Sequence, residues 1–438
     1  MELPGFLQVE QRFPDRSIPD IPAHIRRELS QADFLSGLRP GSRLAIGVGS
    51  RGISNLTVIV KAVVDFWKER GVQPFLFPAM GSHGAATAEG QADVLAHYGI
   101  HEATMGVPVL SSLDVVPLGE TPEGIPTFMD KHAFESDAVF LVGRVKWHTD
   151  FAGGIESGLF KMMAIGLGKF AGAQRYHTFG YKLGLERVVR SVGTQVLKSG
   201  KVIGGLAIQE GAHHETAGLH VVSALRGAEA MMKREEEILR EVKTWMAKLP
   251  APEIDILIVD EIGKNISGAG MDTKVVNRSV NGEYNPWPDT PRVHRIYLRG
   301  LSSNTYHNGV GLGMADVVHN RLVEDIDWNP TQINSLTAST PAAIRTPIHF
   351  ATDRECLSKI SPTVGKHDLN EVTYCRITNT LELVHLFVSE NLAPSLYREA
   401  HAVSKPFRVP FDSRGNFADW NEAALEAGGK AVEVSSHG

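Results

Sequence analysis

The sequence predicts an α/β protein of two domains with mainly parallel, helix-flanked sheets and an active-site cleft between them. Its 438 residues exceed what one hydrophobic core usually serves. Short apolar runs alternate with segments of helical apolar spacing, which is typical of a parallel sheet wound with helices. Pro250 and Pro252 interrupt this alternation after a long charged segment. We therefore expect domains at 1–249 and 253–438.

The first domain is expected to alternate strands and helices from its first apolar run onward. Gly71 and Gly81 punctuate this pattern, because glycine favours the end of a helix or strand. Apolar residues in the first helix recur every three to four positions, so one face is buried. The expected order is strand 43–49, helix 56–70, strand 72–80, helix 88–98, strand 138–145, strand 201–209 and helix 229–248.

The second domain opens with an apolar run at 253–263, and a second strand is expected at 295–301. These runs are rich in isoleucine, leucine and valine, as buried strands of a parallel sheet are. The tail beyond Gly415 has a weak pattern. We expect it to lie over the surface or to be partly disordered.

Charge and cysteine content exclude several classes of protein. A net charge of −6 argues against a nucleic-acid partner. Cys356 and Cys375 are too few for a cysteine-rich zinc site or an iron–sulfur cluster. A disulfide between them stays open, but we expect two free thiols in a reducing compartment. Neither a secretory signal nor a membrane-spanning run is visible. We expect a cytoplasmic protein without a membrane partner; the sequence does not indicate its oligomeric state.

Three polar residues follow the ends of predicted strands, where open α/β sheets bind their ligands. Arg51 lies in a loop with Ser50 before a helix and has the chemistry to hold a carboxylate or phosphate. His83 follows Gly81 and Ser82, where the backbone can approach a ligand closely. His148 follows the strand at 138–145. An ordinary loop arginine, an anion-binding turn and a satisfied loop histidine are the plain alternatives.

Candidate functional side chains are most concentrated at 142–177, where small residues surround two histidines and a lysine. Lys161 has apolar neighbours on both sides, and an amine held among them would have a lowered pKa. His148, Lys161 and His177 are spaced too widely for a short helical zinc motif. An exposed lysine on a helix and a surface histidine at 177 are the competing interpretations.

Together these positions resemble the nickel-dependent lactate racemase family, whose members carry a nickel pincer nucleotide. The resemblance rests on Ser50-Arg51, on Gly81-Ser82-His83, on the stretch from His148 to Lys161, and on His177. The order and spacing of these four motifs are more specific than any one of them.

The resemblance implies a role for each position. Lys161 would be joined covalently to the cofactor through a thioamide, and His177 would bind its nickel. Ser50, Gly81 and Ser82 would contact the cofactor. His83 and His148 would act as acid and base on opposite sides of the substrate, and Arg51 would hold the substrate carboxylate.

The implied reaction is racemisation or epimerisation of a small 2-hydroxy acid. Hydride would pass reversibly from substrate C2 to the cofactor, which is an organic cofactor's task because no side chain accepts hydride. Cofactor-maturation enzymes are the implied protein partners. His83 is followed by Gly84 where the family usually has arginine, so we do not expect lactate in particular to be the substrate.

The second domain adds two candidate substrate-binding cations, Lys274 and Arg278, in a loop after its first strand. The family places polar and cationic substrate contacts in a comparable loop. A capping loop with solvated charges is the alternative for both residues.

Two other functions stay open on the sequence alone. A metal-dependent hydrolase could use His83, His148 and His177, although it would leave Lys161 without a role. A non-catalytic protein could instead bind a nickel cofactor or an anionic metabolite at the same residues.

Overall fold

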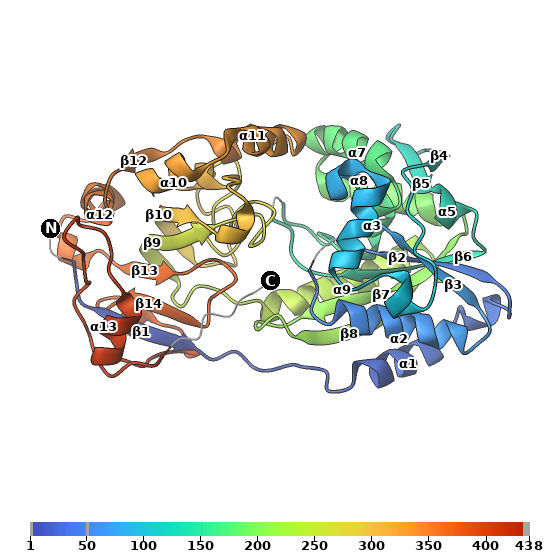
Figure 1. The fold of residues 1–438 in the computed structure, drawn as a ribbon, viewed down its shortest axis with the longest axis horizontal. Coiled ribbons are helices and arrows are strands. Elements are labelled where there is room, and N and C mark those ends of the chain that lie inside the picture. Colours follow the sequence, from blue (N-terminus) through green and yellow to red (C-terminus); the bar gives the residue numbers. More distant parts are fainter. Residues whose placement is uncertain (1–2, 50–51, 150, 432–438) are drawn as a thin grey trace. The chain divides into compact units, whose positions relative to one another are not determined.

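The computed structural model describes residues 3–49, 52–149 and 151–431. The chain forms two compact units (Figure 1). The N-terminal unit is Pro14–Met246, and the C-terminal unit combines Met1–Phe13 with Ala247–Gly438. Residues 1–13 thus differ from the expected division because β1 (Phe6–Gln11) pairs with strands near the end of the chain.

The N-terminal unit is built on a five-stranded sheet. Its order is β3 (Gln73–Pro78), β2 (Arg43–Val48), β6 (Ala138–Arg144), β7 (Val202–Glu210) and β8 (Thr216–Ser223). The first four strands are parallel, and β8 returns antiparallel to β7. A separate hairpin joins β4 (Val115–Glu120) to β5 (Pro126–Asp130).

Alternate residues of these strands enter two different cores, as the side-chain alternation of a strand requires. Leu44 and Ile46 of β2 belong to the core shared with α1 (Ile21–Ser30) and α2 (Leu56–Lys68). Ala45 between them belongs to the opposite core. That second core includes α8 (Leu185–Leu197) and α9 (Ala228–Trp245), together with apolar residues at 159–167, on either side of Lys161. The sheet is therefore covered by helices on both faces.

The C-terminal unit contains an eight-stranded mixed sheet. Its order is β12 (Ile348–Phe350), β11 (Val317–His319), β10 (Arg292–Leu301), β9 (Glu253–Ile262), β13 (Tyr374–Ile377), β14 (His385–Ser389), β1 and β15 (Ala400–Ala402). Pairing is parallel from β12 through to β13 and antiparallel from β13 through to β15. The predicted α/β class with mainly parallel sheets is confirmed.

The end of the chain is more ordered than its pattern suggests. Helix α13 (Trp420–Glu426) buries Trp420, whose ring lies 4.8 Å from both the Phe6 and Phe417 rings, centroid to centroid. These aromatic contacts pack the segment around α13 against the mixed sheet, in line with a tail that lies over the surface, and residues 432–438 lie outside the described part of the chain. In the described part of the chain, no helix is long and apolar enough to span a membrane.

Candidate active site

The carboxyl ends of four parallel strands meet at one edge of the N-terminal unit's sheet. His83 lies in the loop after β3, and His148 lies in the loop after β6. His83 is exposed, and His148 is half-buried with its ring 4.6 Å from the Phe151 ring, centroid to centroid. Both histidines therefore occupy the edge at which such sheets bind ligands. Ser50 and Arg51, predicted at the same edge, lie outside the described residues.

Lys161 ends the short helix α6 (Leu159–Lys161) and leads directly into a π-helical turn, η3 (Met162–Gly166). The amide of Leu167 donates to the carbonyl of Met162 at 2.8 Å, five residues back. Such turns are rare and often occur at functional sites. Lys161 is half-buried, and the following helix α7 (Lys169–Leu183) carries His177, which is exposed.

Close packing at glycines brings the strand-end loops onto this helical segment. A Cβ atom added at Gly81 would lie 2.8 Å from Ile165 Cγ2 and 2.9 Å from Ala173 Cβ. Ile165 follows Lys161 by one helical turn, and Ala173 precedes His177 by one turn. The Gly81-Ser82-His83 loop therefore lies against the segment that carries Lys161 and His177.

The ends of β2 and β6 approach the same segment. A Cβ atom at Gly143 of β6 would collide with the Met162 side chain, and one at Gly49 would lie 4.0 Å from Met162 Cε. Met162 directly follows Lys161. The structure thus gathers the backbone segments of His83, His148, Lys161 and His177 at one sheet edge.

Glu156 organises the His148 loop from within the core. Its side chain is 1% exposed, and its carboxylate accepts from the backbone amides of His148 at 2.7 Å and Gly153 at 3.0 Å. Lys243 of α9 forms an ion pair with the same carboxylate. Both ends of the loop are therefore tied to one buried anion.

Glu210, the last residue of β7, holds the neighbouring loop after β2. Its carboxylate accepts from the Ser54 amide at 2.9 Å and forms an ion pair with Arg144. Arg144 also donates to the carbonyl of Gly52 at 3.0 Å. This bridge anchors the described residues directly after Arg51.

A second buried carboxyl group caps the start of α6. Glu235 of α9 is 1% exposed and accepts from the backbone amides of Leu159 and Phe160, the latter at 3.1 Å. Amides at a helix N-terminus lack partners within the helix. The Glu235 carboxyl therefore fixes where α6, the helical turn that carries Lys161 (hereafter the Lys161 turn), begins. Burial raises the pKa of Glu235 to about 8, against the lowering effect of those two amides.

This raised pKa predicts a pH-dependent stability. The folded carboxyl keeps its proton up to about pH 8, whereas the unfolded chain releases it near the ordinary pKa of 4.5. The folded state therefore binds the extra proton, and its stability falls as pH rises from about 5 to about 8. The glutamine side chain of Glu235→Gln is neutral at every pH. The free energy of unfolding of this variant should therefore fall less between about pH 5 and pH 8, by up to about 4 kcal/mol.

Urea unfolding at pH 5 and pH 9 measures this difference. Glu236→Gln is a matched control, because Glu236 is the adjacent residue but is partly exposed and paired with Arg190. An equal pH response in the wild type and in Glu235→Gln would contradict the prediction.

In the C-terminal unit, Lys274 and Arg278 are both buried. The Arg278 guanidinium is 2% exposed, stacks 3.6 Å from the Tyr284 ring centroid, and pairs with Asp316 at 3.2 Å. It also donates to the Met314 and His294 carbonyls. Lys274 is 5% exposed, with its ammonium 5.1 Å from the Trp287 ring centroid. These contacts give Arg278 a structural role within the loop, and the burial of both residues differs from the solvated charges of the capping-loop alternative.

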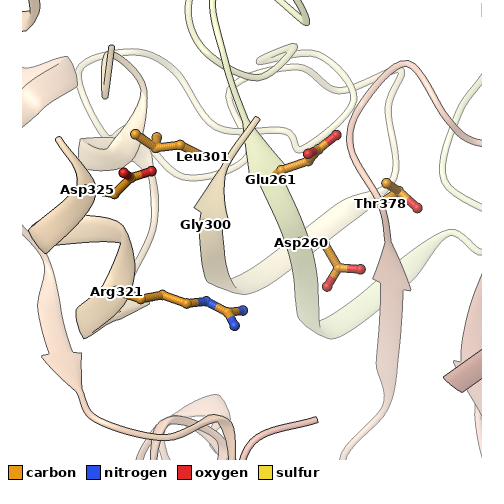
Figure 2. A pocket seen from close by; sticks show the side chains of 7 residues that line it. All are labelled: Asp260, Glu261, Gly300, Leu301, Arg321, Asp325 and Thr378. Carbon is orange, nitrogen blue, oxygen red and sulfur yellow. The ribbon is translucent and has the colours of Figure 1, made fainter. Parts of the chain in front are cut away.

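A pocket of about 490 Å³ lies at the carboxyl ends of β9 and β10 (Figure 2). None of the predicted site residues lines it. Its lining residues are Asp260, Glu261, Gly300, Leu301, Arg321, Asp325 and Thr378.

Metal-ligand geometry bears on the hydrolase alternative. Among the residues that the structure describes, which include all three candidate histidines, no group of three or more histidine, cysteine, aspartate or glutamate side chains could hold a metal ion. A hydrolytic zinc site normally needs three protein ligands.

The buried carboxyls Glu156 and Glu235 were missed from the sequence. Glu156 follows Gly153-Gly154-Ile155 in a loop, and Glu235 lies within a charged helical run, EEE, that is typical of a solvated face. Only the apolar helical spacing around Met231, Ile238 and Val242 could have placed Glu235 on the buried face of α9.

One family model matches part of the chain. Residues 21–182 match the family model described as the lactate racemase N-terminal domain. This span includes His83, His148, Lys161 and His177. No curated protein matches the sequence significantly.

Solved structures provide weaker likenesses. The lactate racemase apoprotein from Thermoanaerobacterium thermosaccharolyticum is 13% identical, with a TM-score of 0.49 over 86% of this chain and 98% of that one. A Thermotoga maritima protein is 14% identical, with a TM-score of 0.47 over 76% of this chain and 84% of that one. Neither score reaches 0.5, so these likenesses add nothing to the sequence match. The likeness to the lactate racemase family therefore rests on residues 21–182.

Proposed function

We propose that this protein is a racemase or epimerase of small 2-hydroxy acids that carries a nickel pincer nucleotide. The observation that carries the proposal is the convergence of the His83, His148, Lys161 and His177 segments within the family-matched region. A metal-dependent hydrolase and a non-catalytic protein that binds a nickel cofactor or an anionic metabolite are the alternatives, and the experiment below separates the racemase from both.

The residues present fit such a cofactor. Lys161 offers a half-buried amine on a turn that Glu235 fixes, and His177 offers one imidazole on the next helix. A single protein ligand suffices where the cofactor itself supplies the other nickel ligands. Ser50, Gly81 and Ser82 would contact the bound group. When bound, the cofactor would supply the acceptor for the hydride of substrate C2.

The protein's own side chains would manage the substrate and its proton. Arg51 would hold the substrate carboxylate, because a guanidinium matches a carboxylate with two parallel hydrogen bonds. His83 and His148 would face the substrate from opposite sides. One imidazole would take the hydroxyl proton from one enantiomer, and the other would return a proton when the opposite enantiomer forms.

The test uses protein produced together with cofactor-maturation enzymes. The loaded protein would be incubated in heavy water with single enantiomers of lactate, malate, 2-hydroxyglutarate, phenyllactate and sugar acids. We expect one of them to racemise or epimerise while keeping its original hydrogen at C2. Solvent deuterium at C2 would contradict hydride chemistry, and loaded protein that converts none of these acids would favour one of the two alternatives.

A further inference from the structure

A buried polar bridge holds the loop that carries His83. Gln91, on helix α3 (Ala88–His97), is fully buried. Its amide nitrogen donates to the carbonyls of Met80 at 3.3 Å and Gly81 at 2.9 Å. Both carbonyls lie within three residues of His83. The side-chain amide of Gln91 therefore binds the backbone directly before the histidine.

Lys169 orients Gln91 from the other side. Its ammonium donates to Gln91 Oε1 at 2.6 Å and to the Pro78 carbonyl at 2.9 Å. Because Oε1 accepts from Lys169, the amide nitrogen of Gln91 must face the loop. Together the two side chains bind three carbonyls, those of residues 78, 80 and 81.

Lys169 occupies an unusual position for a lysine. It is 0% exposed, and its backbone φ is +53°, in the left-handed region that residues other than glycine rarely adopt. The nearest counter-charge is Asp130, whose carboxylate lies 3.7 Å away. Burial lowers the pKa of Lys169 and raises that of Asp130. A strained, buried cation persists only where surrounding contacts determine it, and such residues cluster at functional sites.

Gln91 and Lys169 bind the loop at a point where close packing leaves its backbone little room to move. Gly81 lies so close to Ile165 and Ala173 that an added Cβ would be within 3 Å of both. A shift of the Gly81 carbonyl therefore moves the loop relative to the Lys161 and His177 segment. His83, two residues later, would move with it.

We infer that Gln91, oriented by Lys169, is the positioning residue that sets where the His83 imidazole lies relative to the Lys161 turn. This inference rests on the proposed function for its catalytic consequence. Its structural part concerns the protein alone and is tested without cofactor.

Gln91→Glu keeps the interaction with Lys169 but removes the hydrogen bonds to the loop. The carboxylate still accepts from Lys169, but it has no donor for the Met80 and Gly81 carbonyls. Gln209→Glu is the matched control, because Gln209 is equally buried in the same unit and its amide donates to the Ile238 carbonyl, far from the loop in sequence.

The cofactor-free test places a nitroxide label on the loop through Ser82→Cys. Cys356 and Cys375 are both 0% exposed, so the label should attach selectively at the exposed position 82. We expect the nitroxide spectrum to narrow in Gln91→Glu, which indicates a mobile loop, and to stay unchanged in Gln209→Glu. An unchanged spectrum in Gln91→Glu, or equal narrowing in both variants, would overturn the inference. If Gln91→Glu does not fold, Lys169→Met takes its place with the same expected narrowing.

The loaded enzyme, without the label, supplies the catalytic test. Misplacing a catalytic group by about 1 Å costs on the order of 100-fold in rate, so kcat of Gln91→Glu should fall by about that factor with little change in KM. Wild-type kcat in Gln91→Glu would overturn the catalytic part of the inference. A wild-type protein that converts no 2-hydroxy acid would instead refute the proposed function, and the nitroxide spectra would still decide whether Gln91 positions the loop.

Discussion

Replacing His83 or His148 with asparagine should lower the racemisation rate of the preferred 2-hydroxy acid by about 10²- to 10⁴-fold, the usual contribution of a positioned acid or base. Asparagine keeps a polar side chain of similar reach but does not exchange a proton near neutral pH. In the proposed reaction, one group takes the hydroxyl proton and another returns it, so the loss of either histidine slows the full reaction.

The two variants should differ in which enantiomer they still oxidise. Each keeps one histidine, so each should form 2-keto acid from the enantiomer whose hydroxyl faces that histidine, and the preference should reverse between the variants. Acid quenching of a single turnover, followed by quantification of the keto acid, measures this reversal. His97→Asn, an exposed histidine on α3, is the control and should retain the wild-type rate. Full activity in both site variants would refute their role as proton carriers.

Replacing Asp353 with alanine should destabilise the C-terminal unit by about 3–5 kcal/mol, the range for breaking a buried ion pair from one side. Asp353 is 0% exposed and pairs with Arg299 through bonds of 2.7 and 3.1 Å. It also accepts from the Tyr297 hydroxyl at 2.6 Å and the Phe417 amide at 2.8 Å. Its removal leaves a buried guanidinium with only Asp260 as a counter-charge.

Urea unfolding measures the loss, and hydrogen exchange of β9 and β10 peptides assigns it to the C-terminal unit. Asp325→Ala is the control, because Asp325 is 48% exposed beside His307 and such surface pairs contribute about 0–1 kcal/mol. Similar losses in both variants would contradict the account.

The pKa of Asp353 makes the stability contributed by its contacts with Arg299 and Tyr297 depend on pH. Arg299 and the Tyr297 hydroxyl lower that pKa to about 2, although burial alone would raise it. Because the folded pKa is below the ordinary value of 3.8, the stabilisation is present above about pH 4 and is lost as pH falls toward about 2.

The strands and helices that flank the site were predictable because their signals are local. Apolar runs and glycine stops placed β2, β3, β6 and β7 within a few residues of their observed bounds. The shared carboxyl edge of these strands follows from parallel pairing alone, which is why the placement of His83 and His148 could be expected.

Long-range pairing explains what the sequence did not predict. β1 finds its partners more than 370 residues away, so no local pattern assigns it to the C-terminal unit. The Glu235 carboxyl caps a turn about 75 residues away, and Lys169 meets Gln91 across 78 residues. A buried polar group is recognisable only once its partners are known, because charged residues in a sequence ordinarily indicate a solvated surface.

The covalent state of Lys161 tests the central claim most directly. Protein produced with cofactor-maturation enzymes would be digested, and the peptides carrying Lys161 would be weighed in the wild type and in Lys161→Arg. We predict a stable mass increase on the Lys161 peptide that disappears in the arginine variant together with racemase activity. An active protein whose Lys161 peptide keeps its unmodified mass would contradict the account.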